Sequence, residues 1–269
     1  MIQPATTAAR ANRVIAWCLL VFLVAPALVA IPVSFTSENY LSLPWGGLSL
    51  QYYREVFTSP DWISSFFQST LIGVTSAALA TLIGTLAAVG LWRLASPWGE
   101  VVRGIMLLPL VIPPIIAAMA FYRLYVPLGL IDSYTGLILA HAVLAAPLVL
   151  ITVSASLAGF DRRLEQASRN LGASNTQTLW RVIVPSIRPG MVSGAVFAFI
   201  ASWDEIVVTL FLSKFSVYTL PRRMWNGIRE NTDPAVAAAA VILLAVTFAA
   251  FLIWGIAQRR ARKPKSNPT

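Results

Sequence analysis

The sequence is nearly without the two side chains on which most protein metal sites depend, because it has one cysteine and one histidine in 269 residues. Cys18 lies alone in an apolar run, which excludes a disulfide framework and a cysteine-based metal cluster. His141 has no second metal-ligating residue four positions further on, so we interpret it as a packed, hydrogen-bonded residue and assign no metal. With so few nucleophiles and bases, an enzyme active site is also disfavoured.

Charge is scarce as well. Charged residues make up 12% of the chain, hydrophobic residues make up 57%, and the mean hydropathy is +0.72. A soluble domain cannot carry so apolar a surface, so lipid must be the main solvent. The formal net charge of +9 would favour a nucleic-acid partner in a soluble protein. In a membrane protein the positions of Lys and Arg report topology instead, and we expect no nucleic acid.

Six stretches are long and apolar enough to cross a bilayer as helices, which takes roughly 20 residues each. They cover residues 14–35, 66–92, 104–122, 135–158, 190–213 and 235–257. Pro109, Pro113 and Pro114 predict irregular backbone in the third stretch, because proline removes a helix donor and clashes with the preceding turn. The first stretch follows Arg10 and Arg13, as in an uncleaved signal anchor, and its length favours a retained span. The sequence therefore predicts an all-α membrane protein with six transmembrane helices.

Basic residues gather in the segments that six spans would place on one side of the membrane. The two termini and the second and fourth connections hold 14 of the 20 Lys and Arg residues, with only Glu100, Asp161 and Glu165 as acids. The opposite face holds six basic and six acidic residues. By the positive-inside rule, we expect residues 1–13 and the basic tail 258–269 to lie on the cytoplasmic side of a bacterial inner membrane.

Residues 36–65 form the longest polar connection on the predicted periplasmic side. This segment carries five Tyr and Trp residues: Tyr40, Trp45, Tyr52, Tyr53 and Trp62. Aromatic residues in such a place usually lie at the membrane interface. The alternative is a surface that meets a delivered substrate or its carrier. We predict that the rest of the chain, residues 66–257, forms one core domain.

Residues 161–189 join the fourth and fifth spans. This connection is much longer than the turn that two consecutive helices need. Residues 162–171 predict a short helix that ends at Gly172, a residue able to take the left-handed cap. Ser174 is a good N-cap for a second helix, which leads to Pro185 at the membrane. Two short helices at an angle would make a compact knob that fits a groove on a partner.

At these residues the sequence resembles the permease subunits of binding-protein-dependent ABC importers of the type I fold. Their hallmark is Glu-Ala-Ala, three residues, Gly, nine residues and Ile-x-Leu-Pro. This sequence keeps the spacing of the hallmark with Gln166, Ala167, Ser168, Gly172 and Pro185. It has Gln in place of Glu, Ser in place of the second Ala, and Val in place of Ile and Leu. Glu165 supplies a carboxylate one position early, which leaves open whether Glu165 or Gln166 contacts the ATPase. An ordinary amphipathic interface helix is the alternative interpretation of this loop.

The resemblance implies that the loop is a coupling helix on a separate ATPase subunit. Closure of the ATPase dimer then moves the transmembrane helices between inward and outward states. The implied partners are a second permease, two copies of the ATPase and a periplasmic substrate-binding protein. No Gly-x-x-x-x-Gly-Lys-Ser/Thr motif occurs in the sequence, so we expect ATP and Mg²⁺ to bind the partner ATPase, and no cofactor to bind this chain.

Within this family, residues 202–213, 219–225 and 231–235 are similar to the second permease of spermidine/putrescine-type importers, which implies a polyamine cargo. Acids inside a membrane helix are costly, and by default they mark a pathway or a buried pair. Adjacent helical residues point about 100° apart, so Asp204 and Glu205 cannot both face one way. We predict that one faces the translocation pathway, where Trp203 adds a cation–π contact. The alternatives are a pair with Arg or Lys and the cap of a broken helix.

Two other functions compete with this one. The first keeps the fold and changes the cargo to ferric iron, an opine, an anion or another amine. The second is a secondary transporter or channel that needs no ATPase. That class predicts inverted repeats or further intramembrane charges, which the sequence does not show, and it leaves the cytoplasmic knob unexplained.

Overall fold

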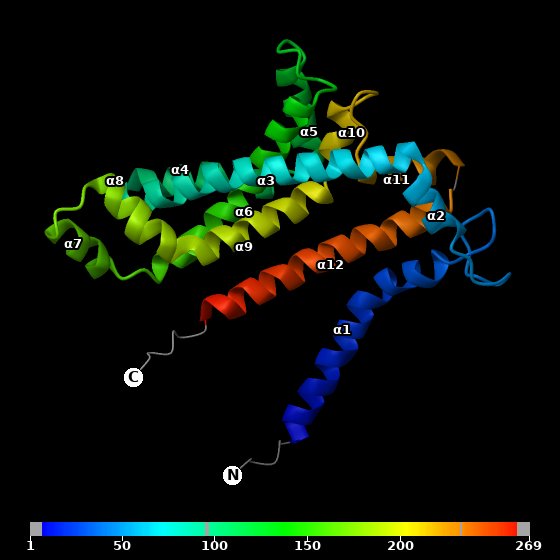
Figure 1. The fold of residues 1–269 in the computed structure, drawn as a ribbon, viewed down its shortest axis with the longest axis horizontal. Coiled ribbons are helices and arrows are strands. Elements are labelled where there is room, and N and C mark those ends of the chain that lie inside the picture. Colours follow the sequence, from blue (N-terminus) through cyan, green and yellow to red (C-terminus); the bar gives the residue numbers. More distant parts are fainter. Residues whose placement is uncertain (1–6, 95–96, 232, 263–269) are drawn as a thin grey trace. The chain divides into compact units, whose positions relative to one another are not determined.

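The computed structural model describes residues 7–94, 97–231 and 233–262, and every regular element among them is helical (Figure 1). The helices are α1 (Thr7–Val33), α2 (Gln51–Thr58), α3 (Pro60–Leu94), α4 (Pro97–Val111), α5 (Pro114–Tyr125), α6 (Tyr134–Ala158), α7 (Arg162–Asn170), α8 (Asn175–Thr178), α9 (Val184–Trp203), α10 (Val207–Leu212), α11 (Leu220–Asn226) and α12 (Ala235–Arg262), with π-helical turns η1 (Leu179–Ile183) and η2 (Gly227–Asn231). The predicted all-α class is confirmed. Parts of both predicted cytoplasmic tails, residues 1–6 and 263–269, lie outside the described residues.

Four of these helices are each long and apolar enough to cross a bilayer: Pro60–Leu94, Tyr134–Ala158, Asn175–Trp203 and Ala235–Ile256. Two bent helices bring the number to six if each counts as one span. The first is α1, which bends by 47° at residue 26, and the second is α4 with α5, which meet at 105°. These six correspond in order to the six predicted stretches.

The third span breaks where its prolines are adjacent. Helix α4 ends at Val111, and α5 begins at Pro114 after Pro113, whose ψ of 135° is not helical. Pro109 lies inside α4 without ending it. The predicted irregular backbone is confirmed, and it is confined to the Pro113–Pro114 pair, where two successive residues lack the N–H that a helix needs.

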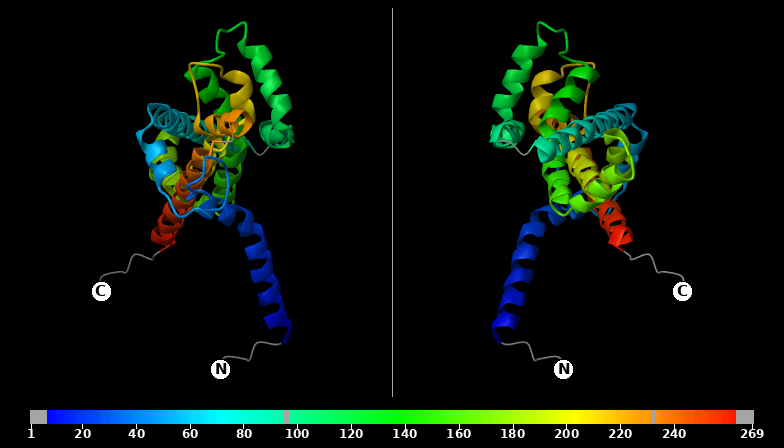
Figure 2. Two further views of the ribbon diagram at one scale, coloured as in Figure 1. Left: turned by 90° about the vertical axis from the view of Figure 1, so that its right-hand side faces the viewer. Right: turned by 90° about the vertical axis from the view of Figure 1, so that its left-hand side faces the viewer.

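Ser64–Arg223 and Val246–Thr269 form one compact unit. In it, α3, α6 and α9 run side by side (Figures 1 and 2) around a core that includes Leu150, Val153 and Ile187. Glycines make this approach possible: a Cβ on Gly194 would lie 2.6 Å from the Thr152 hydroxyl oxygen. Small residues at helix interfaces are the usual way in which membrane helices gain close packing.

The end of α12 that belongs to this unit packs against α9 through aromatic rings. The Phe197 ring lies 6.2 Å from that of Phe251 and 5.9 Å from that of Trp254. The indole N–H of Trp254 also donates to the Ser193 hydroxyl at 2.7 Å. This bond gives a half-buried polar group a partner where water is scarce.

A second cluster lies where α5 meets α10. Helix α5 departs from α4 and packs beside α10 (Figures 1 and 2), with Ala118 and Tyr125 against Leu137, Val208 and Leu212. The bend at Pro113 therefore carries α5 to the second half of the fifth span.

Met1–Ile63 and Met224–Ala245 form the other compact unit. The connection after α1 folds back on itself, because the Tyr53 hydroxyl lies 2.7 Å from that of Ser34 and the Tyr52 hydroxyl donates to the Glu38 carbonyl at 2.6 Å. Its aromatic residues divide between two environments. Tyr52 and Trp62 are buried, whereas Tyr40 and Trp45 are 58% and 83% exposed.

Candidate functional site: the predicted knob and the broken fifth span

The first helix of the predicted knob is α7, and both of its ends are capped by its own sequence. The Asp161 carboxylate accepts from the backbone N–H of Arg163 at 2.9 Å. At the other end Gly172 has a φ of +82°, and the N–H groups of Gly172 and Ala173 donate to the carbonyls of Arg169 and Ser168. This is the Schellman arrangement, and it confirms the predicted left-handed stop at Gly172.

The second helix of the knob starts with a capping box. The Ser174 hydroxyl accepts from the Gln177 N–H, and the Gln177 side chain accepts from the Ser174 N–H. This helix is not the short helix that was predicted. It continues through η1 into α9, so that Asn175–Trp203 is one 29-residue helix. The π-helical turn ends at Ile183, and the Val184 N–H donates to the Leu179 carbonyl five residues back. The helix then continues through Pro185, which has no N–H to donate and lies within the helix rather than at its boundary.

The hallmark residues of the knob lie at different depths. Gln166 and Ala167 are exposed, while Ser168 is half-buried, with its hydroxyl 3.1 Å from that of Thr178. Glu165 is 14% exposed and accepts from Arg169 at 2.9 Å. Adjacent positions of α7 thus face opposite environments.

The fifth span, predicted as a single helix over residues 190–213, is interrupted. Helix α9 ends at Trp203 and α10 begins at Val207, so the sequence pair Asp204 and Glu205 lies in the interruption. The Glu205 carboxylate accepts from the Val208 N–H at 2.8 Å, which caps α10. The side chain of Asp204 is exposed and makes no hydrogen bond or ion pair with the residues that the structure describes.

Trp203, the last residue of α9, is packed inside the protein next to the interruption. It is 1% exposed, its ring stacks on Phe199 with centroids 5.5 Å apart, and it meets the ring of Phe66 edge-on at 5.4 Å. Its indole nitrogen has no hydrogen-bond partner among the described residues. The three residues predicted for the pathway therefore take three positions: packed inside, exposed at the break, and bound to the next helix.

His141 was not predicted to take part in this site, yet it bridges the break. Its Nδ1 lies 2.8 Å from the Ser202 hydroxyl on α9, and its Nε2 lies 3.2 Å from the Thr209 hydroxyl on α10. The Thr209 hydroxyl donates to the Glu205 carbonyl at 3.0 Å, which leaves its lone pairs to accept from Nε2–H. Nδ1 then accepts from Ser202, as expected of a neutral imidazole. No signal in the sequence pairs His141 with residues 61 and 68 positions away.

Asp132, in the connection before α6, holds the segment that follows α10. Its carboxylate accepts from the backbone N–H groups of Lys214, Phe215 and Ser216 at 2.7 to 3.1 Å. Its own N–H donates to the Leu212 carbonyl at 2.7 Å. Partial burial acts to raise the pKa of Asp132, but the hydrogen bonds from these backbone groups outweigh it and hold the pKa well below its ordinary value. Sequence reasoning missed this clamp.

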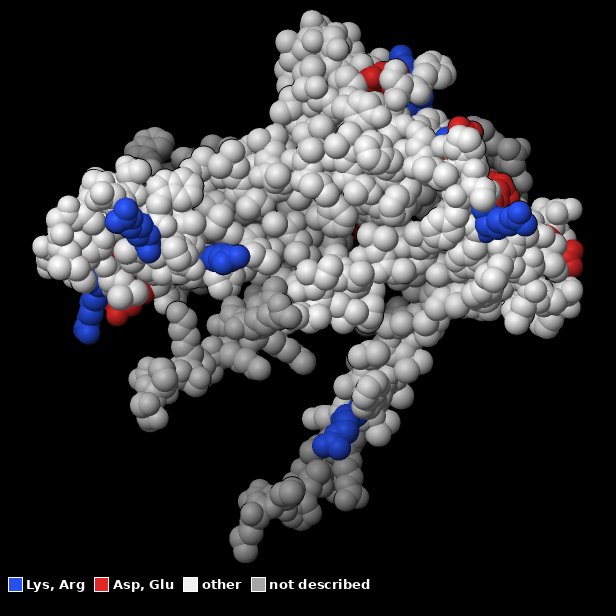
Figure 3. All heavy atoms as spheres, viewed as in Figure 1, with Lys and Arg blue, Asp and Glu red and all other residues white. Residues whose placement is uncertain are grey.

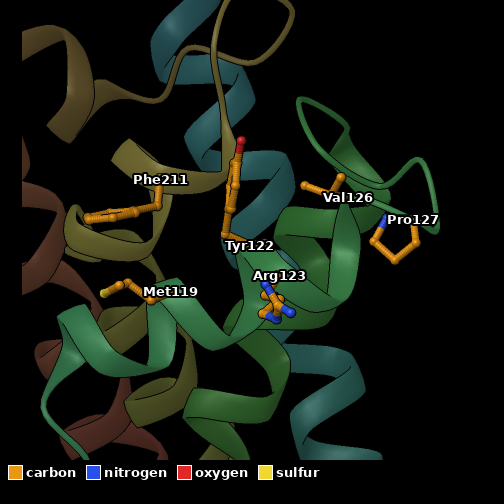
Figure 4. A pocket seen from close by; sticks show the side chains of 6 residues that line it. All are labelled: Met119, Tyr122, Arg123, Val126, Pro127 and Phe211. Carbon is orange, nitrogen blue, oxygen red and sulfur yellow. The ribbon is translucent and has the colours of Figure 1, made fainter.

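A cavity of about 800 Å³ lies between α5 and α10 (Figure 4). Its walls are mostly apolar and its one charged side chain is that of Arg123. The lining residues are Met119, Tyr122, Arg123, Val126, Pro127 and Phe211. Such a hollow suits an apolar group that also carries negative charge.

Two solved structures share this arrangement of helices. A bacterial ABC transporter that imports the acidic polysaccharide alginate matches 95% of this chain and 95% of its own chain, with a TM-score of 0.71 and 18% identity. The MetNI methionine ABC transporter matches 75% of this chain and 96% of its own, with a TM-score of 0.65 and 18% identity. The fold is that of ABC importer permeases of type I, as predicted.

Sequence comparison agrees with the fold. The family model described as the binding-protein-dependent transport system inner membrane component matches residues 80–263. The chain is 30% identical over 239 residues to the spermidine/putrescine transport system permease protein PotC of Haemophilus influenzae, which covers 89% of this chain and 93% of that protein. It is also 30% identical over 250 residues to the putrescine transport system permease protein PotI of Escherichia coli, covering 90% and 89%. The chain belongs to the family of binding-protein-dependent transport system inner membrane components and is a permease subunit of an ABC importer.

Proposed function

We propose that this chain forms half of a translocation pathway for polyamines such as spermidine and putrescine. A second permease forms the other half, two copies of a separate ATPase drive transport, and a periplasmic binding protein delivers the cargo. The names of the relatives support the cargo, because two of them are polyamine permeases that match about nine-tenths of this chain. The alginate transporter, solved with a periplasmic protein that carries a pentasaccharide, supports the delivery step.

The observation that carries the proposal is the exposed carboxylate of Asp204 at the break between two apolar helices. A multiply charged amine that crosses a low-dielectric region needs negative charge along its route. Asp204 is available for that role because nothing in the described chain neutralises it. We assign Glu205 to the cap of α10, and Trp203 to the packing that supports the end of α9.

The continuous helix from Asn175 to Trp203 connects the two parts of the site. At 29 residues it is about 43 Å long, with the knob at one end and Asp204 just beyond the other. A rigid-body displacement of the knob by the ATPase is therefore transmitted to the break in the fifth span. This is how ATP binding and hydrolysis in the partner would alter access to the carboxylate.

In this proposal both termini and the knob face the cytoplasm. Cysteines introduced at Ser174 and Ser49 test it, in a Cys18→Ser background because Cys18 is exposed. Residue 174 should react with a membrane-impermeant reagent only from the cytoplasmic side, and residue 49 only from outside. Labelling of residue 174 from outside contradicts the assigned topology.

An anion is the competing cargo that one specific observation favours, since Arg123 is the one charged residue of the cavity beside α10. Proteoliposomes that contain this chain, its partner permease, the ATPase and the binding protein separate the two. We expect ATP-dependent accumulation of labelled spermidine that excess putrescine inhibits and excess dicarboxylate does not. Inhibition by the dicarboxylate alone supports the anion.

A further inference from the structure

Helix α7 attaches to the rest of its own chain through one face. The Arg162 guanidinium lies 4.9 Å from the centre of the Trp92 ring, and a Glu165 carboxylate oxygen lies 3.7 Å from an Arg93 nitrogen. Three residues further on, Ser168 lies 3.1 Å from Thr178. Positions spaced by three share a helix face, so these contacts hold α7 against the end of α3 and the start of the long helix.

Glu165 is committed to this inner face. The oxygen that lies near Arg93 also accepts from Arg169 at 2.9 Å, and the side chain is only 14% exposed. A hollow of about 360 Å³ adjoins it, lined by Trp92, Arg93, Arg162, Glu165, Gln166 and Arg169. The carboxylate lies among three arginines, where it offsets their mutual repulsion. It is poorly placed to reach a second protein.

The rest of α7 is exposed, including Gln166, which also lines the hollow. Arg163, Gln166 and Ala167 are exposed, and Leu171 at the end of the helix is 89% exposed. Within the described ranges Arg163 forms no ion pair. In the region of α7 and α8, Figure 3 shows more Lys and Arg atoms than Asp and Glu atoms. The exposed part of α7 therefore offers an amide, a methyl group and a cation, and no carboxylate.

We infer that the ATPase contacts Gln166, Ala167 and Arg163, and that Glu165 acts only on its own chain by positioning α7 through Arg93. This inference rests on the proposed function, since it specifies the surface on which the proposed ATPase docks. A groove that fits this part of α7 presents hydrogen-bonding and acidic groups. It does not present the cation that a carboxylate at position 166 would require.

A double-mutant cycle in the reconstituted complex tests the positioning role. Glu165→Gln and Arg93→Gln should each lower the spermidine taken up per ATP hydrolysed at least about threefold, and the double variant should be no worse than the worse single variant. Glu100→Gln is the matched control, because it breaks an arginine–glutamate pair that lies within α4 itself. The control should retain the wild-type ratio. Effects of Glu165→Gln and Arg93→Gln that multiply would overturn the inference.

Gln166→Glu tests the other half without risk to folding, because Gln166 is exposed. We expect the ATPase to bind this variant at least about threefold more weakly than wild type, by titration of the purified ATPase onto the permease pair in nanodiscs. Tighter binding would overturn the inference, since it requires a cation in the groove. Failure of the wild-type permease to bind any ATPase refutes the proposed function itself, so the two failures are distinguishable.

Discussion

The imidazole of His141 lies 2.8 Å from the hydroxyl of Ser202, and through its other nitrogen it reaches Thr209 beyond the break in the fifth span. His141 is 2% exposed. Because one rigid ring joins the end of α9 to the start of α10, it fixes the angle between them, and with it the position of Asp204. We expect His141→Phe to fill the space and remove both hydrogen bonds.

In His141→Phe, the buried Ser202 hydroxyl loses its imidazole partner, at a cost of about 1–3 kcal/mol. The unfolding midpoint should fall, and spermidine uptake should fall with it, while the ATPase still binds to the knob. Thermal denaturation and ATPase titration measure the two effects. Ser202→Ala combined with His141→Phe is the control, and it should recover part of the lost stability because no hydroxyl is then left unpaired. A variant with wild-type stability and uptake contradicts the role given to His141.

The clamp formed by Asp132 predicts a pH dependence. The folded state holds the pKa of Asp132 below its value in the unfolded chain, so the folded state favours the charged carboxylate. This contribution to the free energy of unfolding is complete above the unfolded pKa of about 4, and it is lost as the pH falls from there toward the lower folded pKa. We expect the thermal midpoint of the permease to fall between pH 5 and pH 3 more in the wild type than in Asp132→Asn. Equal pH dependence in the two proteins contradicts the clamp.

Close packing of α6 and α9 depends on glycine at position 194. A Cβ there would lie 2.6 Å from the Thr152 hydroxyl oxygen and 3.0 Å from the Val149 Cα. Gly90, on α3, has nothing within 4 Å of such a Cβ and serves as the control. Gly194→Ala should lower the thermal midpoint because the helices must separate. Gly90→Ala should leave it unchanged or raise it, since alanine is the better helix former by about 1 kcal/mol. Similar shifts in both variants would show that the contact is unimportant.

The sequence predicts local features well where one residue type leaves few choices. Gly172 and Ser174 have the cap geometry expected of them, and Pro113 with Pro114 breaks the third span. Apolar length alone locates the four helices that are long enough to cross a bilayer and the two bent pairs. These features depend on neighbours only a few residues away in the chain, so the local sequence is enough to predict them.

Features that depend on distant partners were not predictable. Nothing in the sequence pairs His141 with Ser202, or Asp132 with the backbone after Leu212, because those contacts follow from how the helices pack. The break after Trp203 was expected only as an alternative, since residues 190–213 have the composition of a continuous span and no proline marks the interruption. The second helix of the knob was expected to be short, but it continues through a π-helical turn and past Pro185. The two acids were recognised as unusual, yet only the structure separates the cap at Glu205 from the free carboxylate of Asp204.

The central claim, that Asp204 meets a polyamine in the translocation pathway, is tested most directly by ATP-dependent spermidine uptake into proteoliposomes that contain the complete transporter. The same preparations of Asp204→Asn, Asp204→Glu and Glu205→Gln are compared by size-exclusion chromatography. We predict that Asp204→Asn reduces uptake several-fold in an intact complex and that Asp204→Glu retains most of it. Glu205→Gln should have the smaller effect, because an amide oxygen still accepts from the Val208 N–H. Wild-type uptake by Asp204→Asn would contradict the account.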